Sequence, residues 1–275
     1  MIIQSAREGQ ARFVIRQVDH ARLAGQFAAA FGNDTFAPLE PKTLMEFVTS
    51  HHDEGWLPAD DSPQRDPDTN LPYQFIETPR ALVVPVHARS PEFNERHHAF
   101  CGLLASMHTW GLYHGRYGLA ERATIDSISP ADKPAVLAML QGELARQARL
   151  QSQLAADPST SRWADDNVLF NCYQQLQFFD TLSLYFCMGD PASPRQALFR
   201  RVPLAVGADV TVMVRPLRRG FYGVSPYPFA EDFLKVGLTG RYMLPVPPPA
   251  NLARSLAETP EETQTFTLVD SGAES

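Results

Sequence analysis

The spacing of apolar residues changes along the chain, and each change predicts a different kind of element. Residues 1–16 hold two short apolar runs around Glu8-Gly9-Gln10, which is typical of a β-hairpin. From residue 17 to Met188, apolar positions recur every three or four residues and predict amphipathic helices. After Gly189, short runs rich in β-branched and aromatic residues indicate strands. We therefore expect a helical body with β structure at both ends.

Five helices are expected in this body, with proline near the start or glycine after the end marking several boundaries. They are residues 17–31, Pro41 to about Asp53, about Pro91 to Tyr117, Ser129 to about Ala156, and about Ser161 to Met188. In the fourth helix, Leu137, Leu140 and Leu144 are expected to face inward. The inward stripe of the fifth helix is expected to comprise Leu169, Cys172, Tyr173, Leu176, Asp180, Ser183 and Cys187.

Two segments lack a clear helical period. Residues 57–80 are rich in proline, aspartate and asparagine and predict a long irregular loop. Loops of this length in compact domains are often lids or binding segments, with disorder or simple decoration as the alternatives. Residues 81–84 are apolar and fit a buried helix and a buried strand equally well.

The predicted fold class is mainly α, an HD-like bundle of about five core helices with a small antiparallel sheet and the N-terminal β-hairpin. The sheet is expected to use the C-terminal quarter, with strands at 210–214, 221–224 and 234–238 and a last edge strand at 265–268. We expect residues 1–275 to form one domain. Its parts would be the hairpin (1–16), the helical core (17–190) and a β-rich extension packed on that core (191–270).

Composition narrows the function classes. A chain of 275 residues with 44% hydrophobic and 20% charged residues can bury a large core and matches an ordinary globular protein. The net charge of -7 argues against nucleic-acid binding as the main activity. The sequence shows neither a secretory signal pattern nor an apolar stretch of about 18 residues, so we expect no membrane span. Three cysteines inside apolar helical patterns predict buried, reduced thiols and a cytoplasmic protein.

The candidate chemistry lies in a set of histidines and aspartates. His52-Asp53 ends a predicted helix and offers an imidazole and a carboxylate, both of which are metal ligands. His20 lies in the first turn of its helix, and His108 is expected to share one helical stripe with His97, Cys101 and Leu104. Asp180 lies within an apolar helix, where a buried carboxylate needs a metal, a cation or several N–H donors. Each residue alone also fits an ordinary satisfied core side chain, but their order on successive helices indicates a shared metal site in a bundle.

This order, from His20 through His52-Asp53 and His108 to Asp180, resembles the HD-domain superfamily of metal-dependent phosphohydrolases. A second likeness, to an uncharacterised bacterial family with an HD-like core, covers almost the whole chain. That likeness is carried by residues 17–26, His52-Asp53-Glu54-Gly55-Trp56, Ser106-Met107-His108, residues 179–184 and Pro226-Tyr227-Pro228-Phe229. The superfamily resemblance implies one metal held by His20, His52, Asp53 and Asp180. His108 would bind a second ion or face the substrate, with His87, His97, His98 and His114 as further candidates.

The resemblance also implies a reaction, the hydrolysis of a phosphate ester or anhydride in a small, anionic, nucleotide-like substrate. One or two divalent ions (Mn, Fe, Mg, Ni or Zn) would lower the pKa of a water molecule and polarise a phosphoryl oxygen. Glu54 or His108 would move the proton, and the inward position of His108 favours it. Many HD phosphohydrolases carry a lysine directly after the turn glycine, where this chain has Trp56. The cation that would replace it is expected to be Lys42, Arg22, Arg96 or Arg116.

Two other functions fit the same residues. A di-iron oxygenase of the HD type needs about four histidines and two aspartates around two ions, and this chain has enough candidates. A non-catalytic HD fold that serves as a metal-binding or regulatory module is the third hypothesis. For all three, we expect no membrane or nucleic-acid partner, and a homodimer remains open.

Overall fold

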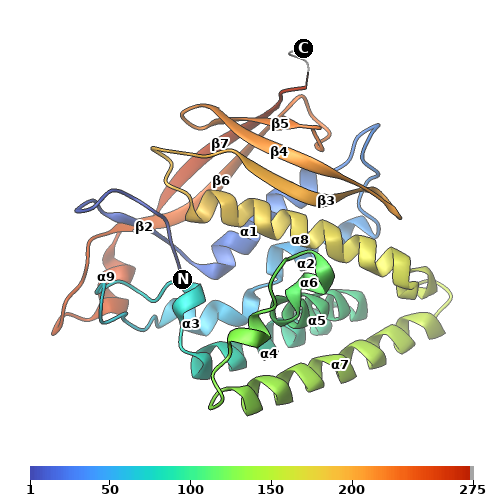
Figure 1. Cartoon of the computed structure of the whole chain (residues 1–275), viewed down its shortest axis with the longest axis horizontal. Coiled ribbons are helices and arrows are strands. Elements are labelled where there is room, and N and C mark those ends of the chain that lie inside the picture. Colours follow the sequence, from blue (N-terminus) through green and yellow to red (C-terminus); the bar gives the residue numbers. More distant parts are fainter. Residues whose placement is uncertain (273–275) are drawn as a thin grey trace.

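The computed structural model describes residues 1–272 and shows a seven-stranded sheet lying over one side of a layer of helices (Figure 1). Helices make up 49% and strands 20% of the chain, and the sheet is a curled, mixed one that forms a half-barrel. The fold is therefore α/β. The prediction of a mainly α, all-helical bundle with a small antiparallel sheet was wrong, because the strands are more numerous and longer than their apolar runs indicated.

The sheet has the strand order β1-β2-β6-β7-β5-β4-β3. The β5–β7 pair is parallel, whereas the other pairs are antiparallel. The predicted N-terminal hairpin is confirmed, and it joins the sheet because β2 pairs with β6. The strands are β1 (Ile2–Ile3), β2 (Arg12–Ile15), β3 (Ala197–Ala205), β4 (Ala208–Arg218), β5 (Phe221–Ser225), β6 (Phe233–Met243) and β7 (Glu262–Asp270).

Two strands explain why the sheet was underestimated. β3 was not predicted, because its pairing with β4 shifts register between Phe199 and Val202 and Arg201 takes a left-handed backbone with φ 59°. That bulge interrupts the alternation by which a strand is recognised. β7 was expected at an edge, but it lies between β6 and β5. It buries Phe266 and Leu268 on one face only, and such alternation is the same for a central and an edge strand of a sheet with one covered face.

The helices are α1 (Gln17–Ala30), α2 (Lys42–His51), α3 (Leu57–Asp61), α4 (Arg80–His97), α5 (Ala99–Tyr113), α6 (Gly115–Gly118), α7 (Lys133–Ala156), α8 (Asp166–Met188) and α9 (Leu252–Glu258). The helices expected from residue 17 and from Pro41 are confirmed. Residues 81–84, which fitted a helix and a strand equally well, are helical and belong to α4. Residues 57–80 are mostly irregular as predicted, but they include α3 and a short 3-10 turn at Phe75–Glu77.

The long helix expected from Pro91 to Tyr117 is divided among α4, α5 and the short α6, and the main break lies between α4 and α5. His98 separates them with an extended backbone (φ −162°, ψ 145°), and its side chain accepts a hydrogen bond from the Phe100 N–H at the start of α5. His97 therefore does not share a helix face with His108, and the stripe expected to join them was wrong.

The buried face of α7 also differs from the prediction. Leu137 and Leu144 are each 48% exposed, whereas Leu140 is buried as expected. The buried stripe is Val136, Leu140, Glu143, Leu150 and Leu154. A glutamate in that stripe concealed its period, because a charged residue normally marks the solvated face. In α8 all seven residues of the predicted inward stripe are buried.

α8 lies between the sheet and the other helices, beside α1 (Figure 1). One apolar core is continuous from α1, α2, α5 and α8 to the inner face of the strands. The three cysteines are buried and free, as predicted. Within residues 1–272, no helix is long and apolar enough to cross a membrane. This packing buries Asp180, in the middle of α8.

Candidate metal centre

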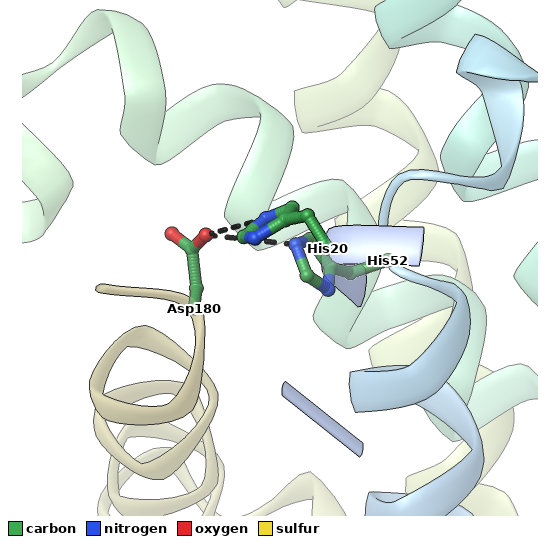
Figure 2. A group of neighbouring side chains, drawn as sticks. All are labelled: His20, His52 and Asp180. Atoms are coloured by element: carbon green, nitrogen blue, oxygen red, sulfur yellow. Dashed lines mark ion pairs between the residues drawn. The ribbon is translucent and has the colours of Figure 1, made fainter. Parts of the chain in front are cut away.

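Four of the five predicted metal ligands meet at one point in the core. Nε2 of His20 and Nε2 of His52 lie 3.2 and 3.6 Å from the same oxygen, Oδ1 of Asp180 (Figure 2). Oδ2 of Asp53 lies 3.8 Å from Nε2 of His20 and 3.7 Å from Nε2 of His52. All four side chains are buried. They come from α1, from the end of α2 and from α8, so that the helix packing itself assembles the cluster.

The spacing of these four atoms suits a cation. Ligands placed about 2.0–2.2 Å from a tetrahedral ion lie about 3.3–3.6 Å from one another. The four His–Asp separations between 3.2 and 3.8 Å bracket that range; His20, His52 and Asp180 form one group of possible ligands, while Asp53 groups with His52 and His108. Three of the four separations exceed the roughly 2.7–3.2 Å of a direct N–H···O hydrogen bond. The residues present therefore fit a divalent ion.

His52 is oriented as a metal-binding histidine would be. Its Nδ1 lies 2.8 Å from the carbonyl oxygen of Thr49, which can only accept, so Nδ1 carries the proton. The lone pair of the neutral ring is then on Nε2. That atom is buried and has no hydrogen-bond partner in the described part of the chain. A buried nitrogen without a partner is costly unless a ligand binds it.

His20 has the same orientation through a hydroxyl group. Oγ of Ser183 donates to the carbonyl oxygen of Asp180 at 3.0 Å, so its one proton is used. Oγ therefore accepts from Nδ1–H of His20, with which it is in close contact. The lone pair on Nε2 of His20 faces Asp180. Metal-ligating histidines almost always donate their other ring N–H in this way, which fixes both the tautomer and the ring orientation.

Charges within the cluster shift the pKa values of its members. Burial disfavours the charged form of His52, but Asp53 and Asp180 outweigh it and raise its pKa to about 9, so without a cation Nε2 carries a second proton, which a bound ion would displace. Burial would also raise the pKa of Asp180, yet Arg116, His20 and His52 hold that pKa well below its usual range. Burial dominates at Asp53, whose pKa is raised in spite of the nearby histidines. Asp53 is thus the carboxylate that gains most from a bound cation.

Arg116 is the cation that reaches the cluster. Its Nη1 lies 2.8 Å from Oδ2 of Asp180, which leaves Oδ1 facing the two histidines. Arg116 takes a left-handed backbone (φ 51°, ψ 44°) in the kink of α6. The other three candidate cations, Lys42, Arg22 and Arg96, form ion pairs with Glu46, Asp19 and Glu92 instead. Of the four candidates, Arg116 alone therefore stands where a substrate-binding cation is expected.

Trp56, at the position of the absent lysine, has a packing role. It is 3% exposed and lies in a small core cluster with Val83 and Val86 of α4. Gly55 before it lies so close to α4 that an added Cβ would come within 2.6 Å of the Ser90 amide nitrogen and would collide with the carbonyl oxygen of Val86. The turn after Asp53 thus fixes that residue against α4.

The fifth predicted ligand, His108, lies at the edge of the cluster. Its ring is 5.0 Å from that of His52, and one of its nitrogens lies within 4.8 Å of the ligand atoms of His52 and Asp53. Its Nδ1 lies 2.9 Å from Nε2 of Gln177. Burial, above all, lowers the pKa of His108 well below its usual value, so the ring is neutral. Glu54 follows Asp53 in a 3-10 turn. Among the described residues, it belongs neither to the cluster of His20, His52 and Asp180 nor to the cluster of His52, Asp53 and His108.

The chain belongs to the DUF3891 family of proteins of unknown function, whose model matches residues 1–244. The expectation of an uncharacterised family is thereby confirmed. No curated protein and no solved structure matches the chain significantly. Nothing in these comparisons indicates membership in the HD-domain superfamily, so the HD assignment has no support from them.

In this DUF3891 protein the remaining candidate histidines lie outside both clusters of the described residues. Nδ1 of His87 contacts the Tyr113 hydroxyl at 2.9 Å. His97 is exposed and stacks on Phe47 with ring centroids 3.5 Å apart. His98 caps α5, and His114 stacks on Trp110.

Sequence reasoning missed Gln177 and Thr49, which orient two of the site histidines. Gln177 precedes Asp180 by one helical turn, so its place on the inner face of α8 was open to inference from the sequence. Its pairing with His108 was not, because that contact depends on how α5 packs against α8.

Proposed function

We propose that this DUF3891 protein is a metal-dependent hydrolase of phosphate esters or anhydrides in small anionic substrates. One observation carries the proposal: the buried Nε2 of His52 has no hydrogen-bond partner in residues 1–272 and faces the carboxylates of Asp53 and Asp180. Arg116 balances the charge of Asp180, and a bound cation would balance that of Asp53.

His20, His52, Asp53 and Asp180 would hold the ion. A divalent cation bound there supplies a water molecule of lowered pKa and polarises a phosphoryl oxygen. Ser183 and the carbonyl group of Thr49 keep the two imidazole lone pairs directed at it. Arg116 keeps Asp180 ionised through its 2.8 Å ion pair, so this carboxylate needs no deprotonation before it binds a cation.

An anionic substrate is supported by Arg116. Its side chain is 19% exposed, so part of it is accessible to solvent. Nη1 contacts Asp180 and Gln177, while a guanidinium group has five N–H donors whose planar arrangement matches phosphate oxygens. Many HD phosphohydrolases carry a lysine directly after the turn glycine, which is Gly55 in this chain. We assign to Arg116 the substrate-binding role expected of that lysine.

The di-iron oxygenase is the second candidate, and one observation favours it. His108 forms a second possible ligand group with His52 and Asp53. This group shares His52 with the group of His20, His52 and Asp180, and His108 already uses Nδ1 in a contact with Gln177. One ion therefore has better support than two, and the hydrolase is the better-supported function.

A direct test loads the purified protein with Mn²⁺, Zn²⁺ or Mg²⁺ and measures phosphate release from p-nitrophenyl phosphate, nucleoside phosphates and dinucleoside polyphosphates. We expect metal-dependent release that His52→Ala abolishes. His97→Ala is the matched control, because it removes an exposed histidine outside the cluster and should retain activity. Oxygen consumption by an iron-loaded protein that releases no phosphate would favour the oxygenase instead.

A further inference from the structure

Three side chains form a hydrogen-bonded chain that ends at His108. Nη1 of Arg116 donates to Oε1 of Gln177 at 2.8 Å. Nε2 of Gln177 lies 2.9 Å from Nδ1 of His108. The same Nη1 of Arg116 also donates to Oδ2 of Asp180. Gln177 is 3% exposed and His108 is 3% exposed, so solvent does not replace these partners.

The direction of the chain follows from the chemistry of its ends. An arginine only donates hydrogen bonds, so the amide oxygen of Gln177 must face Arg116. The amide NH₂ then faces His108 and can only donate. Nδ1 of His108 therefore accepts and carries no proton. If the amide were reversed, the NH₂ group of Gln177 would face the N–H of Arg116. Two donors would then meet in a buried site, which is strongly unfavourable.

This fixes the tautomer of His108. A neutral imidazole with an unprotonated Nδ1 has its proton on Nε2. His20 and His52 have the opposite arrangement, since their Nδ1 atoms donate to Ser183 and Thr49. Of the three histidines at the site, His20 and His52 thus present a lone pair at Nε2 when neutral, whereas His108 presents an N–H.

We infer that Gln177 is a positioning residue that holds His108 as an N–H donor, which prevents His108 from binding a second ion through Nε2. The part played by this donor rests on the proposed function: Nε2–H would hydrogen-bond a substrate phosphoryl oxygen beside the single ion. His108 then neither ligates metal nor accepts a proton at Nε2. This role differs from the metal ligand and the proton carrier that the sequence suggested.

The tautomer is measurable without any turnover. Long-range ¹H–¹⁵N correlation spectra of the full chain, labelled with ¹⁵N-histidine and loaded with Zn²⁺, separate protonated from unprotonated ring nitrogens. The signals of His108 are assigned by their loss in His108→Asn. We expect a protonated Nε2 and a bare Nδ1 for His108. A protonated Nδ1 on His108 in the unaltered protein would overturn the inference.

Gln177→Glu gives a second, independent readout. The carboxylate accepts both from Arg116 and from Nδ1–H of His108, so the tautomer should reverse and Nε2 should present a lone pair. Zn²⁺ binding measured by calorimetry should then rise from about one to about two ions per chain. Gln174→Glu, which adds the same charge to α8 away from Arg116 and His108, should leave one ion. An unchanged tautomer in a folded Gln177→Glu protein would contradict the inference.

These results are separable from the fate of the proposed function. A protein with the expected tautomer and one Zn²⁺ that releases no phosphate would refute the hydrolase and leave the role of Gln177 intact. A phosphatase with a protonated Nδ1 on His108 would do the reverse.

Discussion

Nε2 of His52 lies 3.6 Å from Oδ1 of Asp180, although one residue follows the end of α2 and the other lies in the middle of α8. Nδ1–H of His52 donates to the carbonyl oxygen of Thr49, and Nη1 of Arg116 donates to Oδ2 of Asp180. Each residue therefore presents its remaining ligand atom to the same small volume. This complementarity is what distinguishes the cluster from an ordinary buried ion pair.

Ser183→Ala tests the orientation of His20. The variant removes the hydroxyl group that accepts from Nδ1–H of His20 and should weaken Zn²⁺ binding by about 10- to 100-fold, as removal of such outer partners typically does. The measurement is competitive titration with a fluorescent Zn²⁺ chelator. Ser106→Ala is a matched control, because Ser106 is equally buried but bonds the Glu143 carbonyl. Equal affinities of the two variants would argue against the orientation of His20 by Ser183.

Gly55→Ala tests the turn that holds Asp53. An added Cβ would collide with α4, so the turn must move away and Asp53 with it. We expect a loss of about 1–3 kcal/mol in the free energy of unfolding and weaker Zn²⁺ binding, both followed by urea denaturation with and without Zn²⁺. At Gly142 of α7 nothing lies within 4 Å of an added Cβ, so Gly142→Ala should stabilise by up to about 1 kcal/mol. Similar effects of both substitutions would show that the turn tolerates displacement.

Arg116→Met tests the ion pair at Asp180. Without added metal, the variant leaves a buried carboxylate without its closest cation, and stability should fall by about 3 kcal/mol or more. Zn²⁺ should then raise the Tm of the variant by more than that of the unaltered protein, because the ion supplies the missing charge. Phosphate release should fall by at least about tenfold. Thermal denaturation with and without Zn²⁺ checks the first two effects, and an equal Zn²⁺ shift in both proteins would contradict them.

His87 makes stability depend on pH. Burial, with a smaller contribution from Arg80, lowers its pKa to about 4 from an ordinary value near 6.5. Below pH 6.5 the unfolded chain binds a proton here that the folded chain does not, so stability is lost as pH falls from 6.5 toward 4. At pH 5 the loss is about 2 kcal/mol. His87→Gln removes this titration. The free energy of unfolding of the variant, measured by urea denaturation, should therefore differ less between pH 7 and pH 5 than that of the unaltered protein. Parallel pH profiles would contradict the assignment.

The clustering of the candidate ligands was predictable from sequence because each is a polar residue in an apolar helical context. Asp180 in the buried stripe of α8 and His52-Asp53 at the end of α2 needed only helical periodicity. The environment of His108 was not predictable, since it depends on an arginine held by the left-handed kink of α6. The extent of the sheet was also missed, because the bulge at Arg201 conceals β3 and the one-sided burial of β7 resembles that of an edge strand.

The central claim is that His20, His52, Asp53 and Asp180 bind one cation. The most direct measurement is anomalous diffraction, at the zinc absorption edge, from crystals grown with Zn²⁺. We expect one anomalous peak about 2.0–2.2 Å from Nε2 of both histidines and from an oxygen of each aspartate. Crystals with bound Zn²⁺ at other residues and no anomalous peak among these four would contradict the account.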